Sequence, residues 1–234
     1  LVTVDLNGYT INYMGKDAPL FNVVGQEGNL VLQDGANGEA AALSGGTGEI
    51  AGRSEELDSL IEVKEGGTLT IAGGTLKSKG VRGVLSNNST VTMTGGHIKE
   101  SGIFDAGTSG SNGGGMLLMG SSKFTMTGGS IEGNFGKLGG GVYATNNSQV
   151  EISGSAEITG NKAAKDGGGI YVAGSSTVTV SGGKISGNEA EDCGGGISAL
   201  GNSAVTVSGG EISGNTAHGK AKKGDITLGE VKYE

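Results

Sequence analysis

The chain has 234 residues, of which 51 are glycine and only one is proline, and its formal net charge is −8. This composition excludes collagen, which needs abundant proline beside regular glycine, and the recurring Val, Ile and Leu residues argue against a disordered linker. The acidic net charge does not favour nucleic-acid binding. The single cysteine allows no internal disulfide. No apolar run suggests a signal peptide or a membrane-spanning segment.

In chain order, short strands are expected first in VTVDLNGYTI from Val2, LFNVV near Leu20, NLVLQDG from Asn29 and LIEVKEGG near Leu60. From Thr68 onward the sequence becomes an internal repeat. Its first motif recurs as TLTIAGGTLKSK from Thr68, TVTMTGGHIKES from Thr90, KFTMTGGSIEGN from Lys123, QVEISGSAEITGN from Gln149, TVTVSGGKISGN from Thr177 and AVTVSGGEISGN from Ala204. A second motif lies between the copies, as GGGMLL from Gly113, GGGVYA from Gly139, GGGIYV from Gly167 and GGGISA from Gly194.

The repeat predicts an all-β, right-handed, single-stranded parallel β-helix with three short strands per coil. The last copies start 26, 28 and 27 residues apart, and each contains alternating apolar positions without the three-and-four spacing of a helix. Strands this short bury an apolar face only by wrapping around a common axis, and parallel crossovers favour the right hand. We expect one domain over residues 1–234, roughly eight coils and a rod on the order of 40 Å long.

Two kinds of column should run along this rod. Inside, the first strands should stack one apolar residue above the next, as Leu69, Val91, Phe124, Val150, Val178 and Val205. At the end of each second strand, an asparagine recurs, as Asn134, Asn161, Asn188 and Asn215. Asparagine tolerates turn conformations and bonds to a stacked asparagine above and below it. We therefore predict that this column is a structural asparagine ladder, with its hydrogen bonds used within the fold.

GGGIYV followed by STVTVSGGKISGN resembles the repeats of bacterial right-handed β-helix surface proteins. These include adhesin-like proteins and the polymorphic outer-membrane protein type, whose repeats pair a GG-aliphatic motif with a short motif ending in Asn. The opening VTVDLNGYTI is also similar to the first coil of many such domains. The resemblance is clearest from Thr68 to Asn215 and implies an extracellular location at a bacterial cell surface. The same fold carries polysaccharide lyases, glycosidases and passive stalks.

An enzyme on this fold needs acidic and basic side chains gathered in a groove. Long loops are expected at residues 36–58 and 102–112, and the first holds most of the loop acids, with Glu55 and Asp58 among them. If Glu55 meets Asp58 or Asp105, the two would form a carboxylate pair of the kind that hydrolyses glycosidic bonds. Arg82 or Lys64 in the same groove would support that hypothesis.

No metal and no cofactor are expected. Asp166 and Cys193 occupy the same slot before the glycine triplet, with Asp192 beside it, but Asn112 and Leu138 fill the slot in neighbouring coils. The column of possible calcium ligands is thus broken. His97 and His218 lie in different parts of the repeat. The outward column of His97 has the mixed chemistry of a solvated face, with Thr75, Ser130, Glu157, Lys184 and Glu211.

Two outward faces are candidates for binding. The first strands present threonines on many coils, an arrangement that resembles ice-binding surfaces, but Lys123, Gln149 and Glu151 interrupt the array. The third strands are expected to expose an apolar and aromatic patch, which is typical of a contact surface for protein or sugar. The residues of this patch are Leu117, Met119, Tyr143, Tyr171 and Leu200.

These observations favour a non-catalytic structural and adhesive segment of a bacterial surface protein, cut from a longer chain. Its expected partners are a glycan or protein of a host or neighbouring cell and adjoining domains of the same chain, with neither nucleic acid nor membrane insertion. Open coils expose strand edges and core, so end-to-end self-association is also expected. The alternatives are a polysaccharide lyase or glycoside hydrolase, and an ice-binding threonine face.

Overall fold

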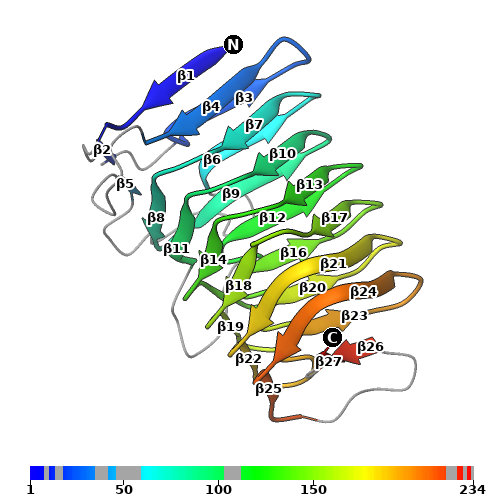
Figure 1. Ribbon diagram of the computed structural model, residues 1–234. Coiled ribbons are helices and arrows are strands. Elements are labelled where there is room, and N and C mark those ends of the chain that lie inside the picture. The colour runs from blue at the N-terminus through cyan, green and yellow to red at the C-terminus, as the bar shows by residue number, and fades with distance from the viewer. Residues whose placement is uncertain are drawn as a thin grey trace.

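The chain winds into a stack of parallel coils, seen in Figure 1 with the two termini at opposite ends of the stack. The computed structural model describes residues 1–7, 11–13, 18–34, 42–45, 59–102, 112–219, 226–228 and 231–232. Every regular element among these residues is a β-strand. None of the described segments is a helix long and apolar enough to cross a bilayer.

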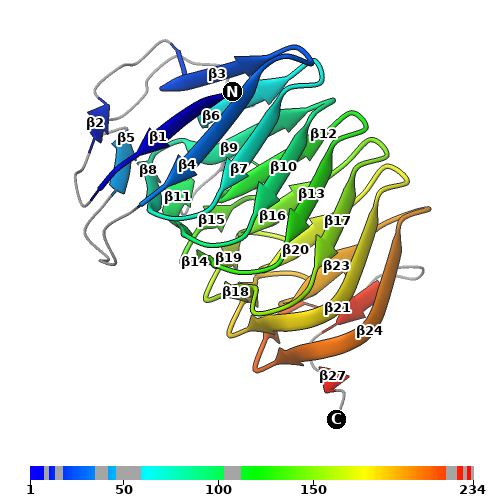
Figure 2. The same ribbon diagram turned by 45° about the horizontal axis from the view of Figure 1, so that its top comes forward.

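Eight first strands form one wall of the stack, each paired in parallel with the next coil. They are β1 (Val2–Asp5), β4 (Asn29–Gln33), β7 (Thr68–Ile71), β10 (Thr90–Met93), β13 (Lys123–Met126), β17 (Gln149–Ile152) and the first halves of β21 (Thr177–Ser186) and β24 (Ala204–Ser213). The number agrees with the eight coils expected from the sequence. Figure 2 shows this wall from a tilted view, with the strands in near-parallel order.

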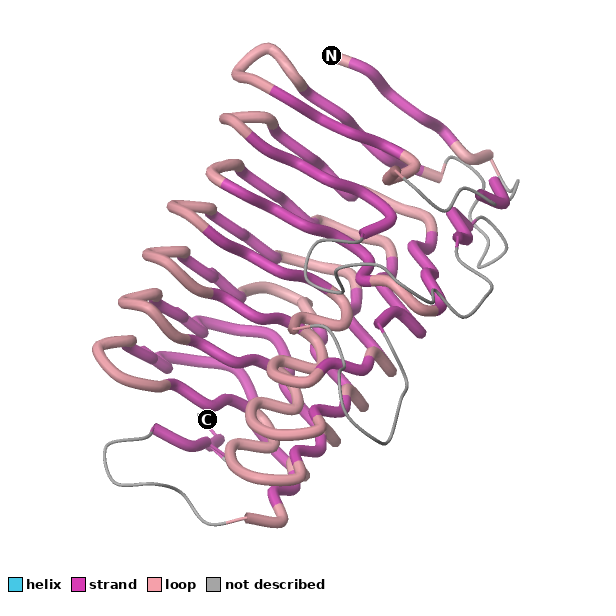
Figure 3. Tube along the Cα trace, turned by 180° about the vertical axis from the view of Figure 1, so that it is seen from behind, coloured by secondary structure: helices cyan, strands magenta, loops and turns pink. Residues whose placement is uncertain are grey.

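The second strands continue the same sheet around a corner, because β21 and β24 run through the corner without interruption. The other second strands are β2 (Ile11–Tyr13), β5 (Ala42–Gly45), β8 (Thr75–Lys79), β11 (His97–Gly102), β14 (Ser130–Glu132) and β18 (Glu157–Thr159). The third strands form a separate sheet from β3 (Phe21–Val24) through β6 (Ser59–Lys64), β9 (Arg82–Asn87), β12 (Met116–Met119), β16 (Val142–Ala144) and β20 (Ile170–Val172) to β23 (Ile197–Ala199). Figure 3 shows the stack from behind.

The structure adds a short fourth strand to the last four coils, where the sequence suggests only a loop. This small sheet consists of β15 (Phe135–Gly136), β19 (Lys162–Ala163), β22 (Glu189–Ala190) and β25 (Thr216–Ala217). Each strand has only two residues, which is too short to show an alternating pattern in the sequence. The expectation of three strands per coil therefore needs correction in this part of the solenoid.

The predicted apolar column of the first strands is confirmed. Cα partners join Leu69, Val91, Phe124, Val150, Val178 and Val205 in that order. Phe124 is fully buried, as are most of its neighbours in the column. Each buried side chain of this kind contributes about 1.5–3 kcal/mol by leaving water. Stacked coils thus share one continuous core that no coil forms alone.

The two ends of the stack differ. At the C-terminal end, β26 (Ile226–Leu228) pairs antiparallel with β23, and β27 (Val231–Lys232) pairs antiparallel with β24. At the N-terminal end, β1 and β3 are the last strands of their sheets. The sequence predicts open coils at both ends, whereas in the structure β26 covers β23 and β27 pairs with Glu211 and Ile212 of β24 at the C-terminal end.

Candidate functional site: the outer face of the third strands

The third strands direct alternate side chains away from the core. We call ten of these positions the third-strand face. In pairs from successive coils they are Leu85 and Asn87, Leu117 and Met119, Tyr143 and Thr145, Tyr171 and Ala173, and Ser198 and Leu200. None of their apolar members belongs to the continuous core of the solenoid. The face therefore offers a regular grid on a rigid sheet, with the coils as its rows.

An aromatic stack lies in the middle of this face. The rings of Tyr143 and Tyr171 are 5.3 Å apart at their centroids and inclined by 14°, which is a stacked arrangement. Their strands β16 and β20 are paired in register at these two residues. Tyr143 is half-buried, while Tyr171 is only 5 % exposed. The pair thus holds one accessible ring against one buried ring.

The expected exposure of this patch is wrong for Leu117 and Tyr171, which are each 5 % exposed. Both residues have a neighbour in the same column on either side. The first glycine of the triplet also folds back over the strand, since a Cβ on Gly167 would lie 2.7 Å from Tyr171 Cβ. Tyr143 and Met119 are half-buried, and Leu200 is 45 % exposed. The accessible part of the patch is therefore Met119, Tyr143 and Leu200.

The asparagine column is bonded from coil to coil. The Nδ2 of Asn134 donates to Asn161 Oδ1 at 2.9 Å, and the backbone N–H of Asn134 donates to the same oxygen at 3.0 Å. Asn161 and Asn188 repeat both bonds to the next asparagine of the column. Each side chain also donates to the backbone carbonyl of a second-strand residue in the preceding coil, as Asn161 Nδ2 does to Ile131 O at 2.8 Å. The amides of Asn161 and Asn188 thus make all of their hydrogen bonds within the fold.

Sequence reasoning missed a second polar column, made of the serines that precede the first strands. These buried residues are Ser89, Ser122, Ser148, Ser176 and Ser203. Ser148 Oγ donates to Thr145 O at 2.7 Å, and its backbone N–H donates to Ser176 Oγ at 3.0 Å. The signal was present as one serine before every first strand from Thr90 onward. Serine is so common in turns that its recurrence did not stand out.

The acids of the enzyme hypothesis, Glu55, Asp58 and Asp105, lie outside the described residues. Of the basic partners, Lys64 binds Glu62 at 3.1 Å and is thereby engaged on its own strand. Arg82 is fully buried, and its Nε donates to Asn112 O at 3.3 Å. In the part of the chain that the structure describes, no three His, Cys, Asp or Glu side chains gather as metal ligands. Asp166 instead accepts the backbone N–H of Cys193 at 3.0 Å.

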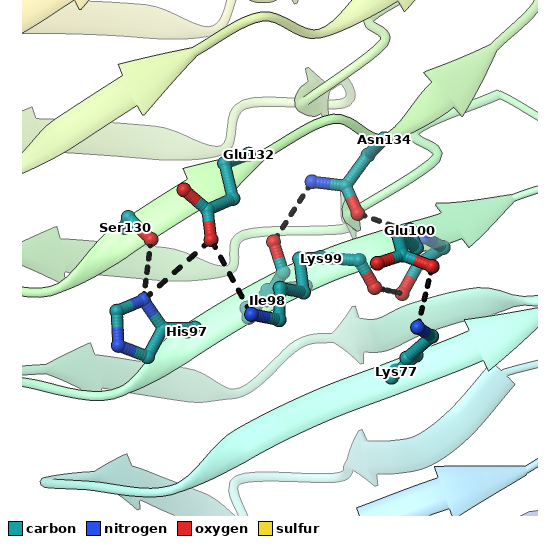
Figure 4. Close-up of polar contacts among 9 residues, drawn as sticks. Lys77, His97, Ile98, Lys99, Glu100, Ser130, Glu132 and Asn134 are labelled. Atoms are coloured by element: carbon teal, nitrogen blue, oxygen red, sulfur yellow. Dashed lines mark hydrogen bonds and ion pairs between the residues drawn. The ribbon is translucent and has the colours of Figure 1, made fainter. Parts of the chain in front are cut away.

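A polar cluster on the second strands has the composition of a catalytic triad but not its geometry (Figure 4). His97 Nδ1 lies 2.7 Å from Ser130 Oγ and 3.8 Å from Glu132 Oε1. A triad needs the serine and the acid on opposite ring nitrogens, whereas here both face the same one. Lys99 shares Glu132 at 3.8 Å. The cluster is a half-buried network of polar contacts between coils.

The threonine face of the first strands carries an ion pair at its centre. Lys123 Nζ lies 2.9 Å from Glu151 Oε1, and Thr125 Oγ1 donates to Glu151 at 3.2 Å. The hydrogen bond from Lys123 lowers the pKa of Glu151; burial opposes this more weakly, and the bond from Thr125 adds a smaller lowering effect. The pair breaks the row of hydroxyl and methyl groups that an ice-binding surface requires.

Replacing Lys123 with methionine is expected to raise the pKa of Glu151 toward its ordinary value. The carboxylate pKa is lowered on folding, so its stabilising contribution is present above the unfolded pKa and is lost as the pH falls through the folded pKa. Because both side chains are largely exposed, the variant should lose less than about 1 kcal/mol at neutral pH. A carboxyl NMR titration measures the shift, and Lys165→Met, in the loop after β19, should leave the titration of Glu151 unchanged. An unchanged Glu151 titration in Lys123→Met would contradict the contact.

The sequence also matches a family model described as "right handed beta helix region", over residues 57–209 and 139–227. Together the two matches extend from residue 57 to residue 227, which is more than half of the chain. No curated protein and no solved structure matches the chain. The parallel coils, the stacked core and this match agree, and the chain belongs to the right-handed β-helix family.

Proposed function

We propose that this chain is a non-catalytic, rigid segment of an extracellular bacterial surface protein that presents the third-strand face to a ligand. The ligand class that best fits this face is a glycan or a protein of another cell. The observation that carries the proposal is the stack of Tyr143 on Tyr171, which keeps a partly accessible aromatic ring on a rigid sheet.

Rigidity is what makes this ring suitable for binding. Tyrosine provides a large amphipathic contact area at a low cost in conformational entropy, and stacking on Tyr171 restricts the ring of Tyr143 further. Met119 and Leu200 add accessible apolar groups on the same face. Thr145, which follows β16, adds a half-buried hydroxyl that donates to Asn146 Oδ1 at 3.3 Å and can accept a hydrogen bond from a ligand. An apolar platform with a few polar groups at its rim is typical of recognition surfaces.

Structural features of the coils also support a passive role. The buried asparagines and serines bond successive coils to one another, so the polar groups that stack along the axis are consumed by the fold. Each described histidine contacts a glutamate of a neighbouring coil. Such a solenoid is suited to holding a surface at a fixed orientation rather than to enclosing a substrate.

Changing Tyr143 to alanine is expected to weaken ligand binding at least tenfold, because the variant removes the accessible ring of the stack. A glycan array, followed by titration of each hit against the wild type and the variant, measures this. Tyr143→Phe is the matched control, since it keeps the stack and should retain most of the affinity if stacking dominates. Thr177→Ala, on the first-strand wall, should bind like the wild type.

The same array, together with a measurement of thermal hysteresis, separates the proposal from its alternatives. Release of reducing ends or of unsaturated sugars from a bound glycan would replace it with a carbohydrate-active enzyme, in which Glu55 or Asp105 is then required. Thermal hysteresis of the wild-type chain, lost on changes to the threonines of the first strands, would instead support an ice-binding face. Equal binding by wild type and Tyr143→Ala would move the ligand site elsewhere.

A further inference from the structure

The turns that lead from the third strands into the next first strands lie in a row along one edge of the stack (Figure 1). From β9 to β23 they comprise residues 88–89, 120–122, 146–148, 174–176 and 201–203, all of them glycine, serine or asparagine. Each turn begins directly after a residue of the third-strand face, so the two form one continuous surface. We call the exposed polar members of these turns the turn ridge, namely Asn88, Ser121, Asn146, Asn147, Ser175 and Asn202.

This combined surface is uncharged. The ten positions of the third-strand face and the five turns have no acidic or basic side chain, whereas 17 % of the whole chain is charged. Glu62 and Lys64 of β6 share the columns of the face but pair with each other at 3.1 Å. Arg82, at the start of β9, is fully buried. The surface therefore offers an ionic ligand no counter-charge from β9 to β23.

The turn beside the accessible tyrosine differs from its neighbours. The coils on either side have Gly-Ser at the two central turn positions, residues 120–121 and 174–175, whereas the coil of Tyr143 has Asn146 and Asn147. Asn146 adopts a φ of +56°, close to the +65° and +60° of the glycines that hold its place in those two coils. Glycine adopts such a φ without strain. The turn geometry alone thus does not require an asparagine beside Tyr143.

Both asparagines present their amides to the solvent next to the ring. Asn146 and Asn147 are exposed, and Thr145 Oγ1 donates to Asn146 Oδ1 at 3.3 Å. Among the described residues, no hydrogen bond engages the side-chain amide of Asn147. An amide carries donor N–H groups and an acceptor oxygen. The pair therefore matches a ligand whose groups both donate and accept hydrogen bonds, as hydroxyl groups do.

We infer that the ligand of the third-strand face is a neutral glycan, one of whose sugar rings lies on Tyr143 while its hydroxyl groups bond to Asn146 and Asn147. The inference rests on the function proposed above and narrows its ligand class. A sugar ring has an apolar face of C–H groups that packs on an aromatic ring. The hydroxyl groups at the edge of the sugar then reach the amides of the adjoining turn.

Other ligand classes fit this surface less well. A uronic or sulfated glycan would bring negative charge to a surface without a cation, on a chain whose net charge is −8. A protein partner would need a broad apolar centre, whereas the accessible apolar side chains of the face are only Met119, Tyr143 and Leu200. One aromatic ring flanked by amides suits the small apolar face of a sugar.

Isothermal titration of the 234-residue chain with a panel of matched oligosaccharides tests the inference. The panel holds uncharged oligosaccharides of glucose, galactose, mannose and N-acetylglucosamine, each beside a uronic or sulfated counterpart. The wild type should bind at least one uncharged member at least tenfold more tightly than its charged counterpart. That affinity should change by less than about twofold between about 50 and 500 mM salt, since no ion pair forms on binding.

The matched variant is the double substitution Asn146→Gly and Asn147→Ser, which gives this turn the Gly-Ser sequence of both neighbouring coils. The variant should melt within a few degrees of the wild type, because the same turn sequence is already accommodated on either side. It should bind the uncharged oligosaccharide at least tenfold more weakly, although Tyr143 is retained. Thr179→Ser, exposed on the first-strand wall, is the control and should bind like the wild type.

Failure of the inference and failure of the proposed function give different results. Binding confined to charged glycans and weakened by salt would overturn the inference, while loss of that binding in Tyr143→Ala would uphold the proposed function. Undiminished binding by the double turn variant would also overturn the inference, since the amides would lie outside the site. If no glycan of the panel binds, the inference is wrong, and the proposed function then requires a protein ligand that Tyr143→Ala no longer binds.

Discussion

A Gly140→Ala substitution is expected to lower the free energy of unfolding by about 3 kcal/mol, even though it adds a single methyl group. Gly140 is the middle glycine of its triplet, where one coil presses against the next. A Cβ there would lie 2.3 Å from Lys162 O and 2.5 Å from Gly168 O, and both atoms belong to the backbone of the following coil. Neither can move aside as a side chain would, so two coils must separate locally. Chemical denaturation measures the loss.

The matched control for this prediction is Gly160→Ala. Gly160 has a φ of +62°, and a Cβ there would meet nothing within 4 Å. The Gly160→Ala variant should lose only about 1 kcal/mol of unfolding free energy, because alanine is strained in the left-handed conformation. Gly140 is not among the glycines with positive φ, so the two variants separate steric crowding from backbone strain. Equal losses of unfolding free energy in both variants would show that the glycine triplet is not needed for the close spacing of the coils.

Replacing Asn161 with alanine is expected to cost about 3–5 kcal/mol, more than most substitutions of a polar residue. Asn161 is fully buried, and its Oδ1 accepts two hydrogen bonds from Asn134. Its Nδ2 donates to Ile131 O and to Asn188 Oδ1, at 2.8 and 3.0 Å. The variant leaves several buried donors and acceptors without partners and opens a cavity between the coils. Urea unfolding monitored by circular dichroism gives the change.

Asn215→Ala is the control for the ladder, because Asn215 holds the same place at its C-terminal end but is half-buried. Water can replace part of what is lost there, so a cost of about 1–2 kcal/mol is expected. A loss at Asn161 no greater than that at Asn215 would mean that the ladder adds little beyond the packing around it.

Strand positions and register were predictable from the sequence because the repeat is regular. A period-two pattern assigns each residue to the inside or the outside, and the intervals between motifs then fix which residues stack. The apolar column through Phe124 and the outward column through His97 follow directly from that alignment. The asparagine positions follow in the same way, since a residue that recurs at the same corner of every coil stacks on its counterpart in the next coil.

The exposed fraction of a side chain was less predictable than the side of the sheet to which it points. Tyr171 points away from the core, as its parity requires, yet the glycine triplet of its own coil folds over it. The burial of Tyr171 depends on the course of the backbone through the glycine corner. A run of glycines has no side-chain pattern from which that course could be predicted. The antiparallel strands β26 and β27 were hidden for a related reason, because they lie beyond the last copy of the repeat.

The arrangement of the coils also has a mechanical consequence. The termini lie at opposite ends of the stack (Figure 1), so a force that pulls them apart acts along the backbone hydrogen bonds between coils. Bonds loaded along their own direction open one coil at a time, like a zipper, whereas bonds loaded sideways fail together. Each step of the last coils would release the 27 residues that separate successive ladder asparagines. A solenoid built this way would extend in small increments under load and yield gradually instead of breaking at once.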